Sequence, residues 1–216
     1  PNSFVSVGGI SGGTNNKVQA HKVGFPAYTY YLFEQVYDAN GKPIEGEFVD
    51  QDGNGSIDDN DRVFRHQKDP KVTMSMSNTF NFKNWDFGFV LRANFGAYVY
   101  NNVLSQRTVL NRTWQNTHLS NMVKNDVYFT GETGQNLYLS DYYLRKGDFL
   151  RVDNITLGYT WDNLFKEKLR LRLYGAVQNP FVITKYNGLD PEVFGGIDND
   201  VYPRPTTYTL GLVATF

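Results

Sequence analysis

A twelve-residue stretch from Asp50 to Asp61 has the composition and spacing of a calcium-binding loop. In such a loop, oxygen ligands stand at positions one, three, five, seven, nine and twelve, and glycine stands at position six. The ligands predicted by this pattern are Asp50, Asp52, Asn54, Ser56 through its carbonyl, Asp58 directly or through water, and Asp61, with Gly55 at the sixth position. Because a hard dication binds six to eight oxygens, this spacing predicts a structural Ca²⁺ site, with Mg²⁺ as a competitor.

The loop departs from the usual pattern at its last position. Asp61 stands where glutamate usually coordinates the ion with both oxygens, so the shorter side chain should weaken Ca²⁺ binding or favour Mg²⁺. Neither flank is predicted as a helix, so the loop would stand alone and not as one of a sensor pair. The alternative is a tight Asp/Asn/Gly turn that holds no metal.

The remaining polar residues do not indicate catalysis. The chain has no cysteine, and its three histidines, His21, His66 and His118, share no metal-ligand spacing. No nucleophile elbow frames a serine, and no pair of loop carboxylates is indicated for glycoside hydrolysis. A net charge of −1 gives no electrostatic reason to expect nucleic acid as a partner. We therefore predict that the chain is not an enzyme and does not bind nucleic acid.

Aromatic residues in the polar stretches are the candidates for contact with a sugar ring. They are Trp114, Tyr142, Tyr143, Phe194 and Tyr202. Large aromatic rings can stack on a ligand, but they also supply much of the packing inside loops. For any one of these residues, packing is the favoured interpretation.

Five long segments with strict two-residue alternation are the elements that would position these loops. In the clearest, Trp85 to Ala97, alternate residues form an apolar face: Trp85, Phe87, Phe89, Leu91, Ala93, Phe95 and Ala97. The other predicted strands are Val72–Phe82, Asp148–Trp161, Leu169–Gln178 and Thr206–Phe216. Strands of soluble proteins average about 5–6 residues, whereas a transmembrane barrel needs strands of roughly 9–11 with one apolar face. The pattern therefore indicates strands that face lipid.

The connections between these strands alternate between short and long. The links at 83–84 and 162–168 are short, whereas segments 98–147 and 179–205 are long. Outer-membrane barrels have short periplasmic turns and long external loops, so the long segments are predicted to be extracellular. One interfacial aromatic girdle is then expected at the periplasmic end, formed by Phe80, Phe82, Trp85, Phe87, Tyr159, Trp161 and Phe216.

Three arginines on the polar faces of these strands are predicted to point into the lumen. They are Arg92, Arg170 and Arg172. Pairing with acids of the lumen wall, such as Asp86, is favoured over a direct role in substrate binding.

Residues 1–71 are predicted to be an external loop region that carries a small hairpin and the metal loop. The stretch 1–27 is rich in Gly, Ser and Asn and is expected to contain one strand end at most. The hairpin arms are predicted at Tyr28–Tyr37 and Lys42–Phe48, on either side of a turn. Residues 72–216 would then supply the last five barrel strands. Because five strands cannot close a wide barrel, most of it is expected upstream of residue 1.

A soluble protein remains the alternative for the same pattern. The five strands would then form an antiparallel sandwich with their apolar faces inside. The chain would in that case be a calcium-stabilised carbohydrate-binding β module of a secreted protein.

Five segments carry a family resemblance: QVYDANGKPI (35–44), KNWDFGFVLRANFGAYVYNNV (83–103), DYYLRKGDFLRVDNITLGYTW (141–161), VQNPFVITKYNGLDPEV (177–193) and YPRPTTYTLGLVATF (202–216). In this order they resemble the C-terminal part of the SusC/RagA-type TonB-dependent outer-membrane transporters, in particular the glycan-importing branch. The resemblance covers most of the chain from about residue 28 onward. Phe216 matches the C-terminal phenylalanine that is read during barrel assembly in such proteins.

The resemblance implies an all-β fold and an import function. The chain would hold the C-terminal strands of a large, 22-stranded antiparallel transmembrane β-barrel with long extracellular loops at the surface of a Gram-negative outer membrane. The cargo would be an oligosaccharide, starch-type or another glycan, or less often a peptide. The implied partners are a SusD-like lipoprotein, the remainder of the barrel chain, and TonB, which would act through an N-terminal part, with its plug domain, that lies outside this chain.

Overall fold

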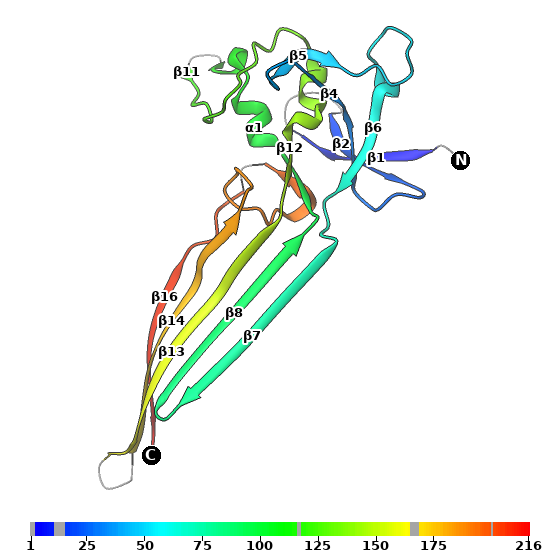
Figure 1. Ribbon diagram of the computed structural model, residues 1–216. Coiled ribbons are helices and arrows are strands. Elements are labelled where there is room, and N and C mark those ends of the chain that lie inside the picture. Colours follow the sequence, from blue (N-terminus) through cyan, green and yellow to red (C-terminus); the bar gives the residue numbers. More distant parts are fainter. Residues whose placement is uncertain (1–2, 11–15, 116–117, 165–168, 200) are drawn as a thin grey trace. The chain divides into compact units, whose positions relative to one another are not determined.

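The chain divides into two units, each built from segments that are far apart in the sequence (Figure 1). The computed structural model describes residues 3–10, 16–115, 118–164, 169–199 and 201–216. The strand unit comprises Lys71–Gly96, Asp148–Lys185 and Pro203–Phe216. The loop unit comprises Pro1–Pro70, Ala97–Gly147 and Tyr186–Tyr202. Most of the predicted first region, the predicted loop 98–147 and the middle of the predicted loop 179–205 thus fold together.

The strand unit is one antiparallel sheet of five long strands, which Figure 1 shows side by side. They are β7 (Val72–Phe82), β8 (Trp85–Phe95), β13 (Phe149–Asn163), β14 (Leu169–Thr184) and β16 (Thr207–Thr215), paired in the order β16-β14-β13-β8-β7. All five predicted strands form, and the all-β prediction is confirmed. No helix among the described residues is long and apolar enough to cross a bilayer.

Several strand ends differ from the prediction by one or two residues, and β14 differs by more. β8 ends at Phe95 because Gly96 turns the backbone with φ of 82°, and Ala97 is therefore a buried residue of the loop unit and not part of the apolar face. β14 continues past Gln178 to Thr184, because pairing with β13 resumes after an irregularity in the register. The predicted loop 179–205 thus begins as strand.

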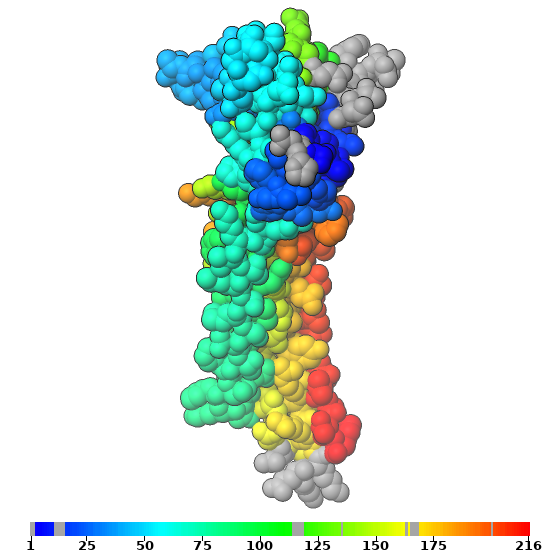
Figure 2. All heavy atoms as spheres, turned by 90° about the vertical axis from the view of Figure 1, so that its right-hand side faces the viewer, coloured from blue at the N-terminus to red at the C-terminus, as the bar shows by residue number. Residues whose placement is uncertain are grey.

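Cross-strand register places the apolar side chains of all five strands on one face. One row of paired positions, Phe80–Phe87–Leu157–Gly175–Leu210, crosses the whole sheet. Within that row Leu210 is 79% exposed, Phe80 56% and Leu157 47%. The space-filling view shows the long strands without a covering layer (Figure 2). Since soluble proteins rarely expose so continuous an apolar surface, this face is suited to contact lipid.

The opposite face of the sheet carries paired charges. The ion pairs are Arg172–Asp86, Arg92–Asp153 and Arg170–Asp162. Arg172 donates to both oxygens of Asp86, at 2.9 Å from Nε and 2.5 Å from Nη2. Gly158 leaves room for this pair, because a Cβ there would lie 2.3 Å from Asp86 Oδ2. The predicted pairing of a lumen arginine with Asp86 is confirmed for Arg172.

Aromatic side chains gather at the end of the sheet that holds the two-residue turn between β7 and β8. Trp85 pairs with Phe82 on one side and with Tyr159 on the other, and its ring centroid lies 4.8 Å from that of Tyr159. The centroids of Tyr159 and Trp161 are 4.7 Å apart. The end of β16 pairs with the start of β14, which brings Phe216 to the same end. The predicted gathering at one rim is confirmed.

The loop unit consists of short strands and single helical turns. A four-stranded sheet has the order β1 (Phe4–Gly9), β2 (Lys17–Lys22), β3 (Thr29–Phe33), β6 (Arg62–Gln67). The other strands are β4 (Gln35–Tyr37) with β5 (Pro43–Phe48), β9 (Tyr98–Asn101) between β12 (Leu144–Lys146) and β15 (Ile197–Asp198), and β10 (Trp114–Gln115) with β11 (His118–Leu119). The helices are α1 (Asn102–Arg107) and the 3₁₀ turns η1 (Asp59–Asp61), η2 (Leu110–Arg112), η3 (Gln135–Leu139), η4 (Asp141–Tyr143) and η5 (Phe194–Gly196).

The N-terminal part of the loop unit is more ordered into strands than the sequence indicates. β1 and β2 pair with each other within the stretch predicted as loop, Phe4 lying opposite Lys22. The predicted arm Tyr28–Tyr37 is split into β3 and β4, which join different sheets. The predicted hairpin is confirmed as β4 paired with β5.

Buried aromatic and polar groups hold the three segments of the loop unit together. The Tyr30 hydroxyl, fully buried, lies 2.7 Å from both the Tyr98 and Gly196 carbonyl oxygens. Gln35 is also buried and accepts a hydrogen bond of 2.7 Å from the Ser140 hydroxyl. These contacts join residues from all three segments and so fix the loops on one another.

Glu45 forms a further set of hydrogen bonds, here called the Glu45 clasp, between the β4–β5 hairpin and the segment after β11. Its carboxylate accepts hydrogen bonds from the N–H groups of Thr130 (2.6 Å) and Gly131 (2.7 Å) and from the hydroxyls of Thr130 (2.9 Å) and Thr133 (3.3 Å). Partial burial raises the pKa of Glu45, but these donors outweigh burial and bring the pKa below its ordinary value. The clasp is therefore strongest when Glu45 is ionised.

We expect Glu45→Gln to loosen this clasp by about 1 kcal/mol. A carboxyl group whose pKa is lowered in the folded state contributes its full stabilisation of the fold when the pH is above its ordinary pKa. This stabilisation is lost as the pH falls through the lowered pKa. Hydrogen exchange at the Thr130 and Gly131 amides of the full-length protein should therefore rise in the variant at neutral pH, and the difference should shrink in acid. The exposed Glu47→Gln is the matched control. Equal protection in all three proteins at neutral pH would contradict the clasp.

Candidate functional site

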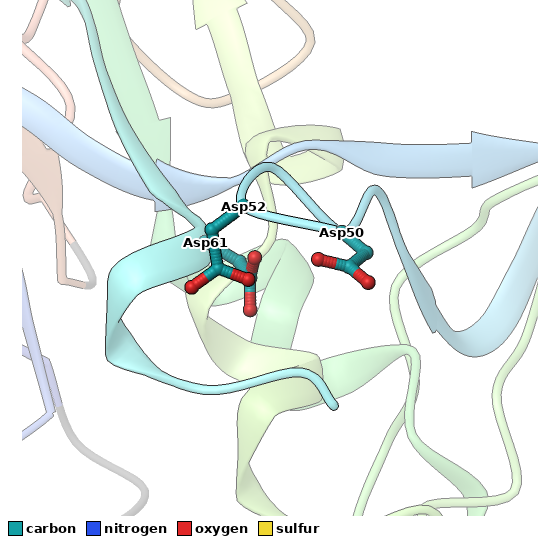
Figure 3. A group of neighbouring side chains, drawn as sticks. All are labelled: Asp50, Asp52 and Asp61. Atoms are coloured by element: carbon teal, nitrogen blue, oxygen red, sulfur yellow. The ribbon is translucent and has the colours of Figure 1, made fainter. Parts of the chain in front are cut away.

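The predicted metal loop forms a turn in which three carboxylates converge. Asp50, Asp52 and Asp61 each offer an oxygen within 4.8 Å of the others. Figure 3 shows these side chains directed toward a shared space beside the loop backbone. Gly53 and Gly55 have φ values of 71° and 80°, a conformation that glycine adopts without strain. The two glycines allow the chain to wrap around the carboxylates.

Asp50 is anchored by the backbone of its own loop. Its carboxylate accepts hydrogen bonds from the N–H groups of Gly55 (2.8 Å) and Gly53 (2.7 Å). These bonds, the one from Gly55 foremost, lower the pKa of Asp50. Asp50 is thus kept as the charged form that a cation requires.

Asp61 closes the loop from within the protein. It is fully buried, and its two oxygens accept hydrogen bonds from Gln51 N–H (2.7 Å) and Asp58 N–H (2.8 Å). Among the described residues, no basic side chain forms an ion pair with Asp61. A buried carboxylate is costly unless it is paired or coordinates a metal, so this arrangement fits a cation at the loop.

The other predicted ligands have different positions. Asn54 Oδ1 accepts a hydrogen bond of 2.7 Å from Ser56 N–H, inside the loop. Asp58 lies outside the group of converging carboxylates, because its side chain caps η1 by accepting from Asn60 N–H at 2.7 Å. Asp58 therefore fits contact through water better than direct ligation. Ile57, at the eighth position of the loop, packs against the core.

The residues present fit a hard dication such as Ca²⁺. Three converging carboxylates supply negative charge, and the loop offers further amide and carbonyl oxygens of the kind Ca²⁺ prefers. The ion would tie the start of the loop to its end, and both ends lead directly into strands of the loop unit.

The predicted sugar-stacking aromatics separate into buried and exposed residues. Tyr142 and Tyr143 are buried, with their ring centroids 5.2 Å apart, in the core of the loop unit. Neither ring face is open to a sugar, so packing is the structural role of both. Phe194 and Tyr202 are almost fully exposed and remain candidates. Trp114 lies in β10, but its side chain falls outside the described residues.

A mainly apolar cavity with a few polar groups, which lies in the loop unit, was not predicted from the sequence. Its polar residues are Asn101 at the end of β9, Asn187, which precedes β15 in the chain, and Asp198 in β15. Apolar side chains complete the lining. Asp198 is buried and accepts a hydrogen bond of 2.6 Å from the Tyr186 hydroxyl. These residues come from distant parts of the chain and form no local motif, so only the folded structure reveals them.

Comparison with known proteins identifies the family. No family model matches the chain. Over 219 residues, however, it is 46% identical to "TonB-dependent receptor SusC" of Bacteroides thetaiotaomicron, a match that covers 96% of this chain. The chain belongs with the SusC/RagA-type TonB-dependent receptors. It spans 21% of the length of that SusC.

A further relative is also a TonB-dependent receptor, and solved structures share the fold. "TonB-dependent receptor P3" of Formosa agariphila is 27% identical over 186 residues, covering 78% of this chain and 19% of the relative. The fold matches the structure of the RagAB peptide importer in its closed-closed state with a TM-score of 0.67 and 20% identity, covering 94% of this chain and 24% of that chain. A second RagAB peptide transporter structure gives a TM-score of 0.68 with the same identity and coverage.

The family relationship settles the membrane interpretation of the five long strands. SusC/RagA-type receptors are outer-membrane β-barrels, and the chain corresponds to their C-terminal part. The apolar face of the strand unit is therefore the face that meets lipid, and the charged face lines the interior of the barrel. The alternative of a soluble carbohydrate-binding module does not account for this relationship.

Proposed function

We propose that this chain is the C-terminal barrel segment of an outer-membrane importer of oligosaccharides. The observation that carries the proposal is the 46% identity to SusC along nearly the whole chain, together with the resemblance of the segments described above to the glycan-importing branch. Import of peptides is the second candidate, because the matching RagAB structures are described as peptide importers at 20% identity. The higher sequence identity to SusC favours an oligosaccharide over a peptide as the proposed cargo.

The proposed importer works with partners that lie outside this chain. β7 and β16 are the edges of the sheet among the described residues, and open edges are unfavourable in lipid, so both would pair with further strands of the same barrel. A plug domain would contact TonB, which supplies energy. A SusD-like surface lipoprotein would cover the external mouth, and the loop unit would belong to that extracellular side. Phe216 would serve as the barrel-assembly signal.

Growth on defined nutrients tests the proposed cargo. Deletion of the full-length gene should abolish or slow growth on at least one oligosaccharide as sole carbon source, with normal growth on monosaccharides and on peptide mixtures. Re-expression of the full-length receptor is the control. Loss of growth on peptides with unchanged growth on every glycan would transfer the proposal to the peptide branch.

We further propose that the loop from Asp50 to Asp61 binds Ca²⁺ with a structural role. The convergence of three carboxylates around two glycine turns, and the buried Asp61, support this proposal. Calorimetric titration of the chelated full-length receptor should show uptake of Ca²⁺ at millimolar concentration or below. Chelation should loosen the loop without unfolding the barrel. If no Ca²⁺ is taken up near millimolar, the loop is only a turn.

A further inference from the structure

A cavity of about 310 Å³ in the loop unit has the features of a small ligand site. Its polar lining consists of Asn101, Asn187 and Asp198, and its apolar lining includes Val103, Val123 and Leu189. The volume lies at the lower end of the range for ligand pockets, roughly 300–1,000 Å³. Among the described residues, those that line the cavity include none from the metal loop and none of the predicted sugar-stacking aromatics.

The carboxylate of Asp198 is held in a fixed position at this cavity. Its Oδ2 accepts the Tyr186 hydroxyl at 2.6 Å, and its Oδ1 lies 3.4 Å from Val201 N–H. Burial and this hydrogen bond raise the pKa of Tyr186, so its hydroxyl stays protonated and remains a donor. Each carboxylate oxygen has a further lone pair that can accept a hydrogen bond from a ligand.

A glycine keeps the backbone close to this hydrogen-bonded pair. A Cβ on Gly188 would lie 2.3 Å from Tyr186 Cε1 and 2.6 Å from Asp198 Oδ2, so no larger residue fits without displacing one of them. The neighbouring Asn187 and Leu189 are exposed and reach the cavity from the same segment. The glycine thus allows the 187–189 segment to bring one polar and one apolar side chain beside Asp198.

The amides of the cavity are only partly used within the protein. Asn101 Oδ1 caps α1 by accepting from Leu104 N–H at 2.8 Å, and Asn101 Nδ2 lies 3.4 Å from Asn187 Oδ1. Among the described residues, no acceptor within the protein pairs with Asn187 Nδ2. The cavity therefore offers a hydrogen-bond donor at Asn187 and a charged acceptor at Asp198. Apolar side chains line the same cavity.

The chemistry of the lining selects among ligand classes. The Asp198 carboxylate would repel an anion, and no basic side chain among the described lining residues offsets that repulsion. A purely apolar ligand would leave a carboxylate and amides without partners, which is costly. A sugar ring has hydroxyls that both donate and accept and C–H groups that pack on aliphatic side chains. It satisfies all parts of this lining.

We propose that the cavity is a subsite for one sugar residue of a neutral glycan, with ring hydroxyls hydrogen bonded to Asp198 and Asn187 and the C–H surface against Val103, Val123 and Leu189. This inference rests on the proposed oligosaccharide import and assigns part of its specificity to the loop unit. A charge-assisted hydrogen bond to Asp198 would supply much of the affinity.

Binding by variants of the full-length receptor tests the subsite. The purified receptor in detergent is titrated calorimetrically with a panel of neutral oligosaccharides of three to eight residues (α-glucans, β-glucans, mannans and fructans) and with a mixture of short peptides. Asp198→Asn keeps the size of the side chain and the acceptor for Tyr186 but removes the charge. We expect it to weaken the affinity for the bound glycan by about tenfold to a hundredfold. Leu189→Ala removes part of an exposed apolar side chain that lines the cavity. This substitution should weaken the affinity for the glycan several-fold.

Matched controls separate a binding effect from a folding effect. Asp126→Asn changes an exposed acid of the same unit that does not line the cavity, and its affinity should equal that of the parent protein. Thermal unfolding of all variants checks that the barrel is intact. If the parent binds a glycan and both Asp198→Asn and Leu189→Ala bind it equally well, the subsite is wrong while the proposed import stands. If the parent binds peptides and no neutral glycan, the proposed cargo fails, and the sugar assignment fails with it.

Discussion

We expect Leu157→Arg to reduce sharply the yield of folded receptor in the outer membrane. Leu157 lies in the middle of β13, on the apolar face, and is half exposed. Placing a guanidinium there exposes a charge to hydrocarbon, which costs about 2–4 kcal/mol near the bilayer midplane. The amount of heat-modifiable, protease-resistant receptor in isolated outer membranes measures this effect.

The neighbouring residue provides the control for this substitution. Thr156→Arg introduces the same side chain one position earlier, where the alternation directs it to the charged face that carries Arg172 and Asp86. We expect nearly normal yield for Thr156→Arg. If both variants assemble equally well, or equally badly, the two faces of the sheet do not differ as the assignment requires.

The second large effect is expected at the buried end of the metal loop. Asp61→Asn keeps the side-chain shape but removes the charge and one acceptor for a backbone N–H. We expect the affinity for Ca²⁺ to fall by on the order of a hundredfold, because ligand charge sets the affinity of such loops. In the parent protein the Gln51 and Asp58 backbone N–H groups donate hydrogen bonds to the Asp61 carboxylate. Hydrogen exchange at these two amides should also increase in the variant.

An adjacent acid outside the ligand pattern is the control for Asp61. Asp59→Asn removes a carboxylate whose side chain is 86% exposed and which contacts Arg62 at 3.5 Å. Its Ca²⁺ affinity should remain within about threefold of the parent, because exposed charges at longer range are screened by salt. A large loss for Asp59→Asn with none for Asp61→Asn would show that the ion is held elsewhere.

The long strands could be predicted from the sequence because their signal is local. In β7 and β8 each residue faces either lipid or the barrel interior, so the alternation continues without interruption and gives the bounds almost completely. The prediction fails where a backbone feature interrupts the period. Asn179 has a positive φ of 49° inside β14, and the strand continues beyond it although the alternation changes phase.

The loop unit could not be predicted to the same extent because its core is assembled from distant segments. Tyr30, Tyr100 and Tyr143 are completely buried in one core. In the sequence, however, Tyr30 lies in the N-terminal region, and Tyr100 and Tyr143 lie near opposite ends of the predicted loop 98–147. No periodicity marks such residues as core. For this reason, the sequence leaves Tyr143 as a candidate ligand contact, with packing favoured, and only the structure shows that its ring is enclosed.

The two candidate sites differ in the same way. All carboxylates of the metal loop lie within twelve residues, so their spacing alone predicts that Asp50, Asp52 and Asp61 converge. The cavity around Asp198 combines residues almost a hundred positions apart, and its hydrogen bond to Tyr186 depends on the path of the backbone at Gly188. A local motif is visible in a sequence, whereas a cavity between segments is not.

Single-cysteine labelling of the long strands tests the central assignment most directly. Because the chain contains no cysteine, one substitution at a time gives a unique site for a nitroxide or fluorophore in this part of the protein. In reconstituted full-length receptor, labels at 157 and 210 should be accessible to a lipid-phase quencher, and labels at 156 and 209 to a water-soluble one. Alternation of this kind along β13 and β16 is the predicted result. Equal aqueous accessibility at all four positions would contradict the account that one face of this sheet meets the membrane.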